Sequence, residues 1–202
     1  MENTKIFAEK LASAMEKMDG MNPVEKAGIL GLQKREQRLV FDFFNRRIHL
    51  EALEFNDEGG EVVTDAVKFV FCTYLLNCPE RPVESSNRLI SFREFNGAGP
   101  LFSRFTANTS NIIETAFSGK IDLLKQQCIR LGGSMMQTAG YDVSARFRAL
   151  HRIPIILHFN DAEEGLPASA VFLFHDNAEA YLDLECMTIL TTYLTGCLIQ
   201  TA

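Results

Sequence analysis

The sequence lacks three features that would place it in a common functional class: an excess of positive charge, a long apolar run, and cysteines at metal-ligand spacing. Its net charge is −6, whereas proteins that bind nucleic acid need a concentrated positive field. Its longest apolar run, 153–159, is broken by Pro154 and His158, and a bilayer requires roughly 20 apolar residues. We therefore expect neither a nucleic-acid partner nor a membrane partner.

The cysteines are odd in number and irregularly spaced, and several lie among apolar neighbours in helical patterns. Such thiols are typical of a reduced, buried core. No pair has the spacing of zinc or iron–sulfur ligands, so we predict no metal site and no cofactor. The N-terminal segment lacks the apolar centre of a secretory signal, which favours a cytoplasmic protein. The five cysteines are Cys72, Cys78, Cys128, Cys186 and Cys197.

Catalytic and nucleotide-binding motifs are also missing. The sequence has no P-loop, no GxGxxG segment and no nucleophile elbow. His175 and Asp176 could act together only if their strand has already ended, because adjacent strand residues point to opposite faces. His49 and His158 fall on the polar sides of their strands, and we interpret them as surface residues. The sequence identifies no catalytic residue and favours a protein that is not an enzyme, while leaving catalysis open.

What the sequence does contain is 47% hydrophobic residues, enough for a substantial core in one domain over residues 1–202. Apolar residues at three- and four-residue steps predict amphipathic helices at both ends of the chain and further helices between them. The predicted helices cover residues 4–18, a short segment from Pro23, residues 65–77, residues 100–131 in two pieces, and the segment that follows the capping residue Asp183.

Alternating apolar and polar residues predict strands. The predicted strands cover residues 38–44, 46–55, 89–92, 141–150, 153–159 and 168–174. Strands joined by short turns pair antiparallel, and here helices flank them in the sequence, so we predict the α+β class with a largely antiparallel sheet. The strand order stays open, as does the question of whether residues 1–60 share a sheet with residues 143–202.

Two groups of polar residues are candidate binding sites. One group follows the polar side of a predicted strand at two-residue steps and could hold an anion or the carboxylates of a partner: Asp142, Ser144, Arg146 and Arg148. Ser91, Arg93 and Glu94 precede the glycine-rich turn at 96–100, where the backbone could approach a ligand closely. The alternative for the first group is a solvated strand face, and the alternative for the second is a structural ion pair.

Several segments resemble an uncharacterised bacterial and archaeal family, domain of unknown function 3786, over roughly residues 65–199. The strongest match is "LISFREFNGAGPLFSRF", which contains the "ISFRE" pattern of that family. Further matches, in the family order, are Gly132–Gly133, Pro154 with the apolar residues after it, Pro167–Ala168, Leu173–Phe174 and Ala180–Leu182. The chain departs from the pattern where Ser134 follows Gly-Gly and where His175 precedes Asp176, in both cases in place of an aspartate.

The resemblance implies a setting but no reaction. Family members occur in anaerobes, and some are fused to or encoded near iron–sulfur and corrinoid proteins of one-carbon metabolism. This chain lacks the cysteine cluster of the fused forms, so we expect it to hold no iron–sulfur cluster.

Three hypotheses follow from the sequence. The first is a cytoplasmic binding or accessory domain that docks a small anionic ligand or a partner protein through Arg93, Glu94, Arg146 and Arg148. The second is a hydrolase or transferase that uses Glu94 or Asp142 as a general base, which would require a buried carboxylate with a raised pKa. The third is a structural homo-oligomer, with the C-terminal helix or a strand edge as its interface.

Overall fold

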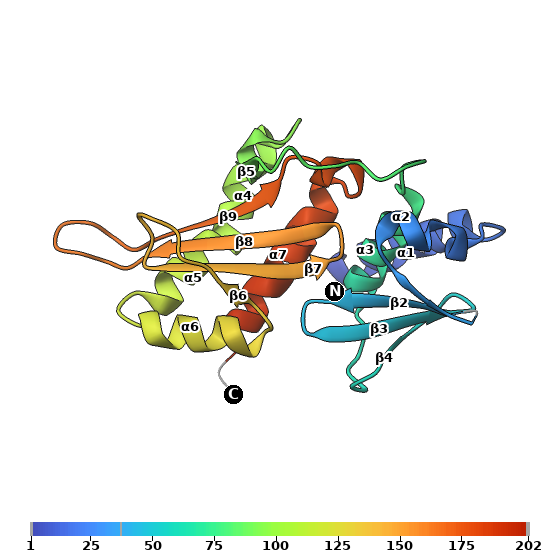
Figure 1. The fold of residues 1–202 in the computed structure, drawn as a ribbon, viewed down its shortest axis with the longest axis horizontal. Coiled ribbons are helices and arrows are strands. Elements are labelled where there is room, and N and C mark those ends of the chain that lie inside the picture. The colour runs from blue at the N-terminus through green and yellow to red at the C-terminus, as the bar shows by residue number, and fades with distance from the viewer. Residues whose placement is uncertain (1, 37, 201–202) are drawn as a thin grey trace. The chain divides into compact units, whose positions relative to one another are not determined.

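The computed structural model describes residues 2–36 and 38–200, which divide into two compact units. Unit 1 comprises the residues up to Glu84 together with 150–152 and 177–190. Unit 2 comprises residues 85–149, 153–176 and the residues from Thr191 on. Each unit has a β-sheet of its own (Figure 1).

Unit 1 combines helices with a four-stranded antiparallel sheet in the order β1-β2-β3-β4. Its N-terminal elements are α1 (Glu2–Met18), the 3₁₀ turn η1 (Pro23–Lys26) and α2 (Ala27–Leu30). Its strands are β1 (Gln33–Arg35), β2 (Arg38–Phe43), β3 (Arg46–Glu51) and β4 (Glu54–Asp57). The remaining elements are α3 (Asp65–Leu76), η4 (Ala178–Ala180) and the first half of α7 (Leu184–Ile199).

Side-chain caps begin these helices where the sequence predicts them. Asn22 accepts a hydrogen bond from the Val24 N–H at 3.2 Å, and Thr64 Oγ1 accepts one from the Val67 N–H at 3.4 Å. Asp183 Oδ1 accepts from the Cys186 N–H at 2.8 Å. Each cap satisfies a backbone donor that the first helical turn leaves unpaired.

An aromatic cluster joins the four-stranded sheet to α3. The ring centroid of Phe71 lies 4.8 Å from that of Phe41 and 5.6 Å from that of Phe55, in stacked arrangements. Phe43 meets Phe71 edge-on at 5.2 Å. Phe41 and Phe43 occupy alternate positions of β2 and are both fully buried, so one face of the sheet packs on the helix.

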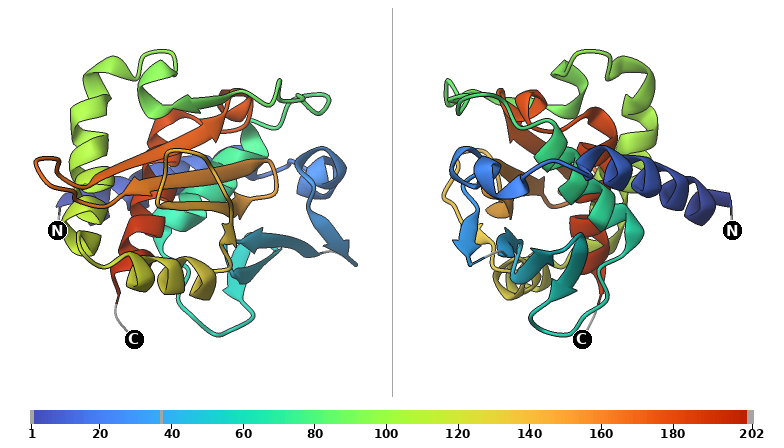
Figure 2. Two further views of the ribbon diagram at one scale, coloured as in Figure 1. Left: turned by 60° about the vertical axis from the view of Figure 1, so that its left-hand side comes forward. Right: turned by 90° about the vertical axis from the view of Figure 1, so that its right-hand side faces the viewer.

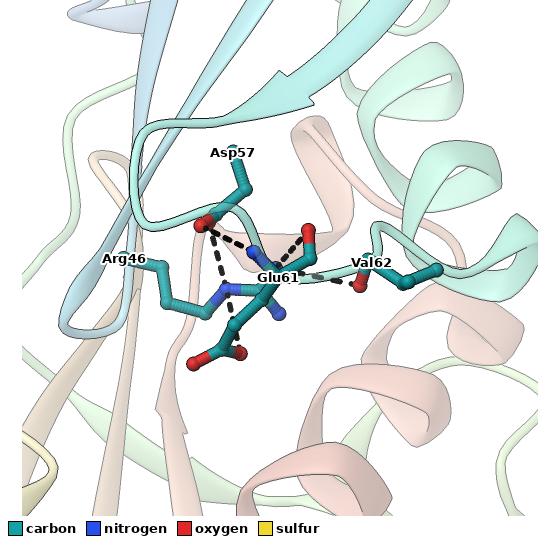
Figure 3. Close-up of polar contacts among 4 residues, drawn as sticks. All are labelled: Arg46, Asp57, Glu61 and Val62. Atoms are coloured by element: carbon teal, nitrogen blue, oxygen red, sulfur yellow. Dashed lines mark hydrogen bonds and ion pairs between the residues drawn. The ribbon is translucent and has the colours of Figure 1, made fainter.

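A buried ion pair holds the connection between β4 and α3 (Figure 3). Arg46 Nε lies 2.9 Å from Asp57 Oδ2, and the two side chains are only 10% and 2% exposed. The Arg46 guanidinium also donates to the carbonyl oxygens of Glu61 and Val62 at 3.5 and 3.4 Å. Asp57 Oδ1 accepts from the Glu61 N–H at 3.2 Å. Two buried charges therefore neutralise each other and fix the loop that follows β4.

Unit 2 contains a five-stranded sheet in the order β5-β9-β8-β7-β6. The pairs β5–β9, β8–β9 and β6–β7 are antiparallel. The strands are β5 (Leu89–Ser91), β6 (Ser134–Met135), β7 (Val143–Leu150), β8 (Ile153–Asn160) and β9 (Ser169–His175). Between β5 and β6 lie η2 (Phe92–Glu94), η3 (Gly99–Leu101), α4 (Phe102–Asn108), α5 (Ser110–Phe117) and α6 (Ile121–Arg130).

The inner face of the five-stranded sheet forms the core of unit 2. Helices α5 and α6 lie on this side, whereas the connection between β6 and β7 crosses the opposite side (Figures 1 and 2). The inward residues of β7 are at most 1% exposed, which confirms the side predicted from their alternation. They are Val143, Ala145, Phe147 and Ala149.

Two predicted elements differ from the structure. The segment 46–55 is not one strand, because Ala52 and Leu53 form a two-residue hairpin turn with φ of 47° and 64°. Both residues lie in the left-handed region, where Asn-Gly is the usual turn sequence, so Ala-Leu gives no local turn signal. Residues 100–131 contain three α-helices, α4 to α6, where two were predicted.

The predicted α+β class with antiparallel strand pairs and terminal helices is confirmed. The question that the sequence left open is answered as well: residues 33–57 form a sheet separate from that of β7, β8 and β9. The assignment of residues 1–202 to one domain stays a prediction. Among the described residues, every helix is too short or too polar to span a membrane.

Asp57→Asn is expected to lower the free energy of unfolding by about 3 kcal/mol, because it leaves the Arg46 charge buried without its main carboxylate. Chemical denaturation measures this change. Glu61→Gln is the matched control: the Glu61 side chain is 69% exposed, so its contact with Arg46 should contribute about 0.5 kcal/mol. Equal losses in the two variants would contradict the role assigned to Asp57.

Candidate functional site

The outer face of the five-stranded sheet carries most of the residues that the sequence singles out. Ser144 hydrogen-bonds His158 across β7 and β8, so both belong to this face. His158 pairs with Val171, and the next outward pair is Ile156 with Leu173. Leu173 in turn pairs with Ser91. Because outward residues recur at every second position, Arg146, Arg148, His175 and Leu89 lie on the same face.

Arg146 and Arg148 are the open charges of this outer face. Both are exposed, and neither forms an ion pair with any residue in 2–36 or 38–200. Two-residue steps along a strand place their Cα atoms roughly 7 Å apart. The predicted polar side of β7 is therefore correct for these two arginines, which are free to hold an external anion. It is wrong for Ser144, which is only 2% exposed and has its hydroxyl bonded to His158.

Ser91 and Glu94 form a capping arrangement at the end of β5. Glu94 Oε2 accepts the Ser91 N–H at 2.7 Å and the Ser91 hydroxyl at 3.1 Å. Glu94 Oε1 accepts from Arg88 at 2.8 Å, although both of these side chains are largely exposed. The Ser91 N–H, followed by its hydroxyl and by Arg88, holds the pKa of Glu94 below its usual value. Glu94 thus stabilises the turn into η2, and its ion pair is the structural alternative foreseen for this segment.

Arg93 points to a different neighbour. Its guanidinium carbon lies 5.7 Å from the centroid of the Phe102 ring in α4, within cation–π range. On the sheet, β9 and β8 separate β5 from β7, so Arg93 and Arg146 belong to elements roughly 14 Å apart. The structure therefore does not gather Ser91, Arg93 and Glu94 with Arg146 and Arg148 into one pocket.

Asp142 lies immediately before β7 and lines a cleft of about 590 Å³. Its Oδ2 accepts the Asp161 N–H at 2.8 Å, while its own N–H donates to Asn160 Oδ1 at 3.1 Å. The other lining residues are Gly140, Tyr141, Glu163, Leu166, Pro167 and Ser169. Asp142 is exposed, and these bonds tie the start of β7 to the end of β8.

The interpretation of His158 as a surface residue is wrong. His158 is only 4% exposed, because the Tyr141 ring stacks on it and covers the outer face at this point. The centroids of the two rings lie 4.2 Å apart. Its Nδ1 lies 2.7 Å from Ser144 Oγ, which lies 2.9 Å from Thr138 Oγ1. Burial lowers the pKa of His158 and favours the neutral ring. Alternation alone could not reveal this, since the covering residue comes from the loop before β7.

His175 and Asp176 meet through Ser85, because β9 ends at His175. Ser85 Oγ lies 2.9 Å from His175 Nδ1 and donates to Asp176 Oδ1 at 2.7 Å. Burial lowers the pKa of His175, and the positive charge of Arg146 lowers it further. The negative charge of Asp176 acts in the opposite direction and raises the pKa of His175, so charges of both signs surround this ring.

The described part of the chain offers no metal centre: no group of three or more His, Cys, Asp or Glu side chains there is arranged to hold an ion. The five cysteines form no disulfide bond with one another. Burial raises the pKa of Cys72 and of Cys128 to about 12, which disfavours the thiolate that a nucleophile or metal ligand needs.

Comparison with known proteins identifies the family of this chain. The model described as Domain of unknown function (DUF3786) matches residues 22–196. The chain belongs to this family. The match begins well before the resemblance at 65–199, so the family includes the four-stranded sheet of unit 1 as well as the five-stranded sheet. No curated protein and no solved structure matches the chain.

Glu94 is expected to titrate below an ordinary glutamate in the folded protein, as measured by NMR of its carboxyl carbon. A lowered pKa stabilises the fold above the unfolded pKa, and this contribution is lost as the pH falls through the folded pKa. Ser91→Ala should raise the pKa only in part, because the backbone N–H remains. An unshifted pKa in the wild-type protein would contradict the capping role.

The unfolding free energy should decline as the pH falls below 6.5, the ordinary histidine value, because His158 has a lowered pKa in the folded state. The unfolded chain then binds protons first, so stability is complete above that value and decreases toward the folded pKa. His158→Gln should flatten this dependence in denaturant titrations across pH. An unchanged slope would show that His158 does not titrate as described.

Proposed function

We propose that the protein is a binding domain that docks an acidic partner protein through Arg146 and Arg148. The observation that carries this proposal is the pair of exposed guanidinium groups on one strand, without an ion pair to any described residue. A guanidinium presents a planar fork of donors that matches a carboxylate in a two-point contact. Acidic side chains of a partner are the chemistry that this face is built to accept.

A protein fits the outer face better than a small molecule does. Sites for small ligands are concave and enclose most of the ligand. Neither Arg146 nor Arg148 lines any of the three clefts described in this chain. Elsewhere on the outer face, Leu173 of β9 is half-buried and Leu89 of β5 is 36% exposed, which adds apolar area. Arginine together with apolar residues is typical of protein interfaces.

The enzyme hypothesis finds less support. A general base needs a raised pKa, whereas the pKa of Glu94 is lowered by its capping bonds. Asp142 is exposed and engaged with the Asp161 N–H. Ser144 and His158 lie too deep beneath Tyr141 for a substrate to reach them in this conformation.

The setting proposed for this binding is the cytoplasm of an anaerobe, in one-carbon metabolism that uses corrinoid and iron–sulfur proteins. Membership of the family supports this part of the proposal, because the setting is the one that the family resemblance implies. An acidic surface on a protein of that metabolism would supply the carboxylates for Arg146 and Arg148.

Arg146→Glu/Arg148→Glu is expected to abolish binding of a fluorescent polyglutamate peptide, measured by anisotropy. The wild-type affinity should fall as salt is added, because exposed charges are screened. Lys34→Glu/Arg35→Glu, an equal charge change on the exposed strand β1, is the matched control and should leave binding intact.

Two results would overturn this proposal. One is peptide binding that survives the Arg146/Arg148 change. The other is displacement of the peptide by inorganic phosphate at equal concentration of negative charge, which would indicate a site for small anions in place of a docking face.

A further inference from the structure

The connection between β8 and β9 forms an acidic hairpin that we call the finger, residues 161–168. It extends beyond the ends of both strands (Figure 1). At its tip Glu163 and Leu166 form an isolated β-bridge, with their N–H and carbonyl groups paired at 3.1 and 2.9 Å. Gly165 between them has a φ of 82°, which closes the turn.

Hydrogen bonds also hold the base of the finger. Asp161 Oδ1 accepts the Gly119 N–H at 2.7 Å and the Ala162 N–H at 2.8 Å. The tip and the base are thus both hydrogen-bonded. A segment ordered in advance loses little conformational entropy when a partner binds it.

The finger presents charge and apolar surface that the chain itself does not use. Glu163 and Glu164 are exposed and form no ion pair within residues 2–36 and 38–200. Leu166, next to them, is 64% exposed. A large apolar side chain at the tip of a projecting hairpin is a common feature of interaction sites.

The outer face offers the complement of the finger. It has two unpaired arginines where the finger has two unpaired glutamates. It also has apolar side chains that are partly open to solvent, among them Leu89 and Leu173. The two surfaces therefore carry equal numbers of opposite charges, and each also has exposed apolar area, which is the complementarity that selects partners.

We propose that the acidic partner is a second copy of this chain, with the finger of each copy docked on the outer face of the other. This inference rests on the proposed function and names its partner. Glu163 and Glu164 pair with Arg146 and Arg148, and Leu166 packs against Leu173. A reciprocal exchange of this kind closes a two-fold dimer and leaves no unfilled site to extend a chain of molecules.

The finger cannot reach the arginines of its own copy. Ser144 and His158 lie side by side, and β8 returns beside β7 after the turn at 151–152. From that level, Arg146 lies two residues toward the turn, whereas the finger begins three residues in the opposite direction. Five residues of strand separate them by roughly 16 Å. Only another molecule can bring the two surfaces together.

Charge-swap variants of the full chain, studied by sedimentation equilibrium, test this proposal. The wild-type protein should form a dimer, and both Glu163→Arg/Glu164→Arg and Arg146→Glu/Arg148→Glu should be monomeric. Mixing the two variants should restore dimers that contain one copy of each, because every altered charge then meets its opposite. Glu9→Arg/Glu16→Arg, on the exposed side of α1, is the matched control and should remain dimeric.

The outcomes separate this inference from the proposed function. A monomeric wild-type protein that still binds polyglutamate through Arg146 and Arg148 would overturn self-association and keep the docking face for a different protein. A monomer that also fails to bind the peptide would overturn both. Circular dichroism verifies folding of the variants, and Leu166→Asp provides an independent change that should weaken the dimer. A dimer that persists in both charge-swap variants would also contradict the proposal.

Discussion

The alternation of side chains along β7 is the constraint on which the rest of unit 2 depends. Val143, Ala145 and Phe147 enter the core and are almost completely buried. A shift of one residue in strand register would turn these side chains outward and bury Arg146 and Arg148. The large cost of burying two unpaired charges therefore specifies the pairing of β7 with its neighbours. The same constraint places His158 beneath Tyr141 and directs the finger away from the arginines.

The charged residues of this chain fall into two groups with different roles. The first group forms ion pairs within the chain, which hold loops and turns in place. These pairs are Arg46 with Asp57 and Arg88 with Glu94. Arg146 and Arg148 have no such partner among the described residues, and the fold is complete without one. Charges of the second kind favour a solvated surface or an external partner. Under our proposal, the finger favours an external partner, because Glu163 and Glu164 on it also lack ion pairs within the described residues.

Features determined by neighbouring residues were predictable from the sequence. The caps at Asn22, Thr64 and Asp183 and the two sides of β7 depend on a few adjacent positions, and the structure has them as expected. Features determined at a distance were not. The turn at Ala52–Leu53 is imposed by the pairing of β3 with β4 against local preference. The burial of His158 depends on a ring from another segment, and the division into two sheets leaves no local mark in the sequence.

For the candidate site, the sequence was enough to predict that Arg146 and Arg148 are exposed on one side of a strand. Their separation from Arg93 could not be predicted, because it depends on the order of the strands in the sheet.

The bond between Glu94 and the Ser91 N–H has a consequence for solubility. β5 is an edge strand of the five-stranded sheet, with β9 on one side only. An edge strand exposes backbone donors to which a strand of another molecule could add, and such addition leads to aggregation. Because the Glu94 carboxylate already occupies the Ser91 N–H, an incoming strand finds no donor at this position. The charge that ends β5 thus blocks one backbone donor on the open edge of the sheet and disfavours the addition of another chain at that point.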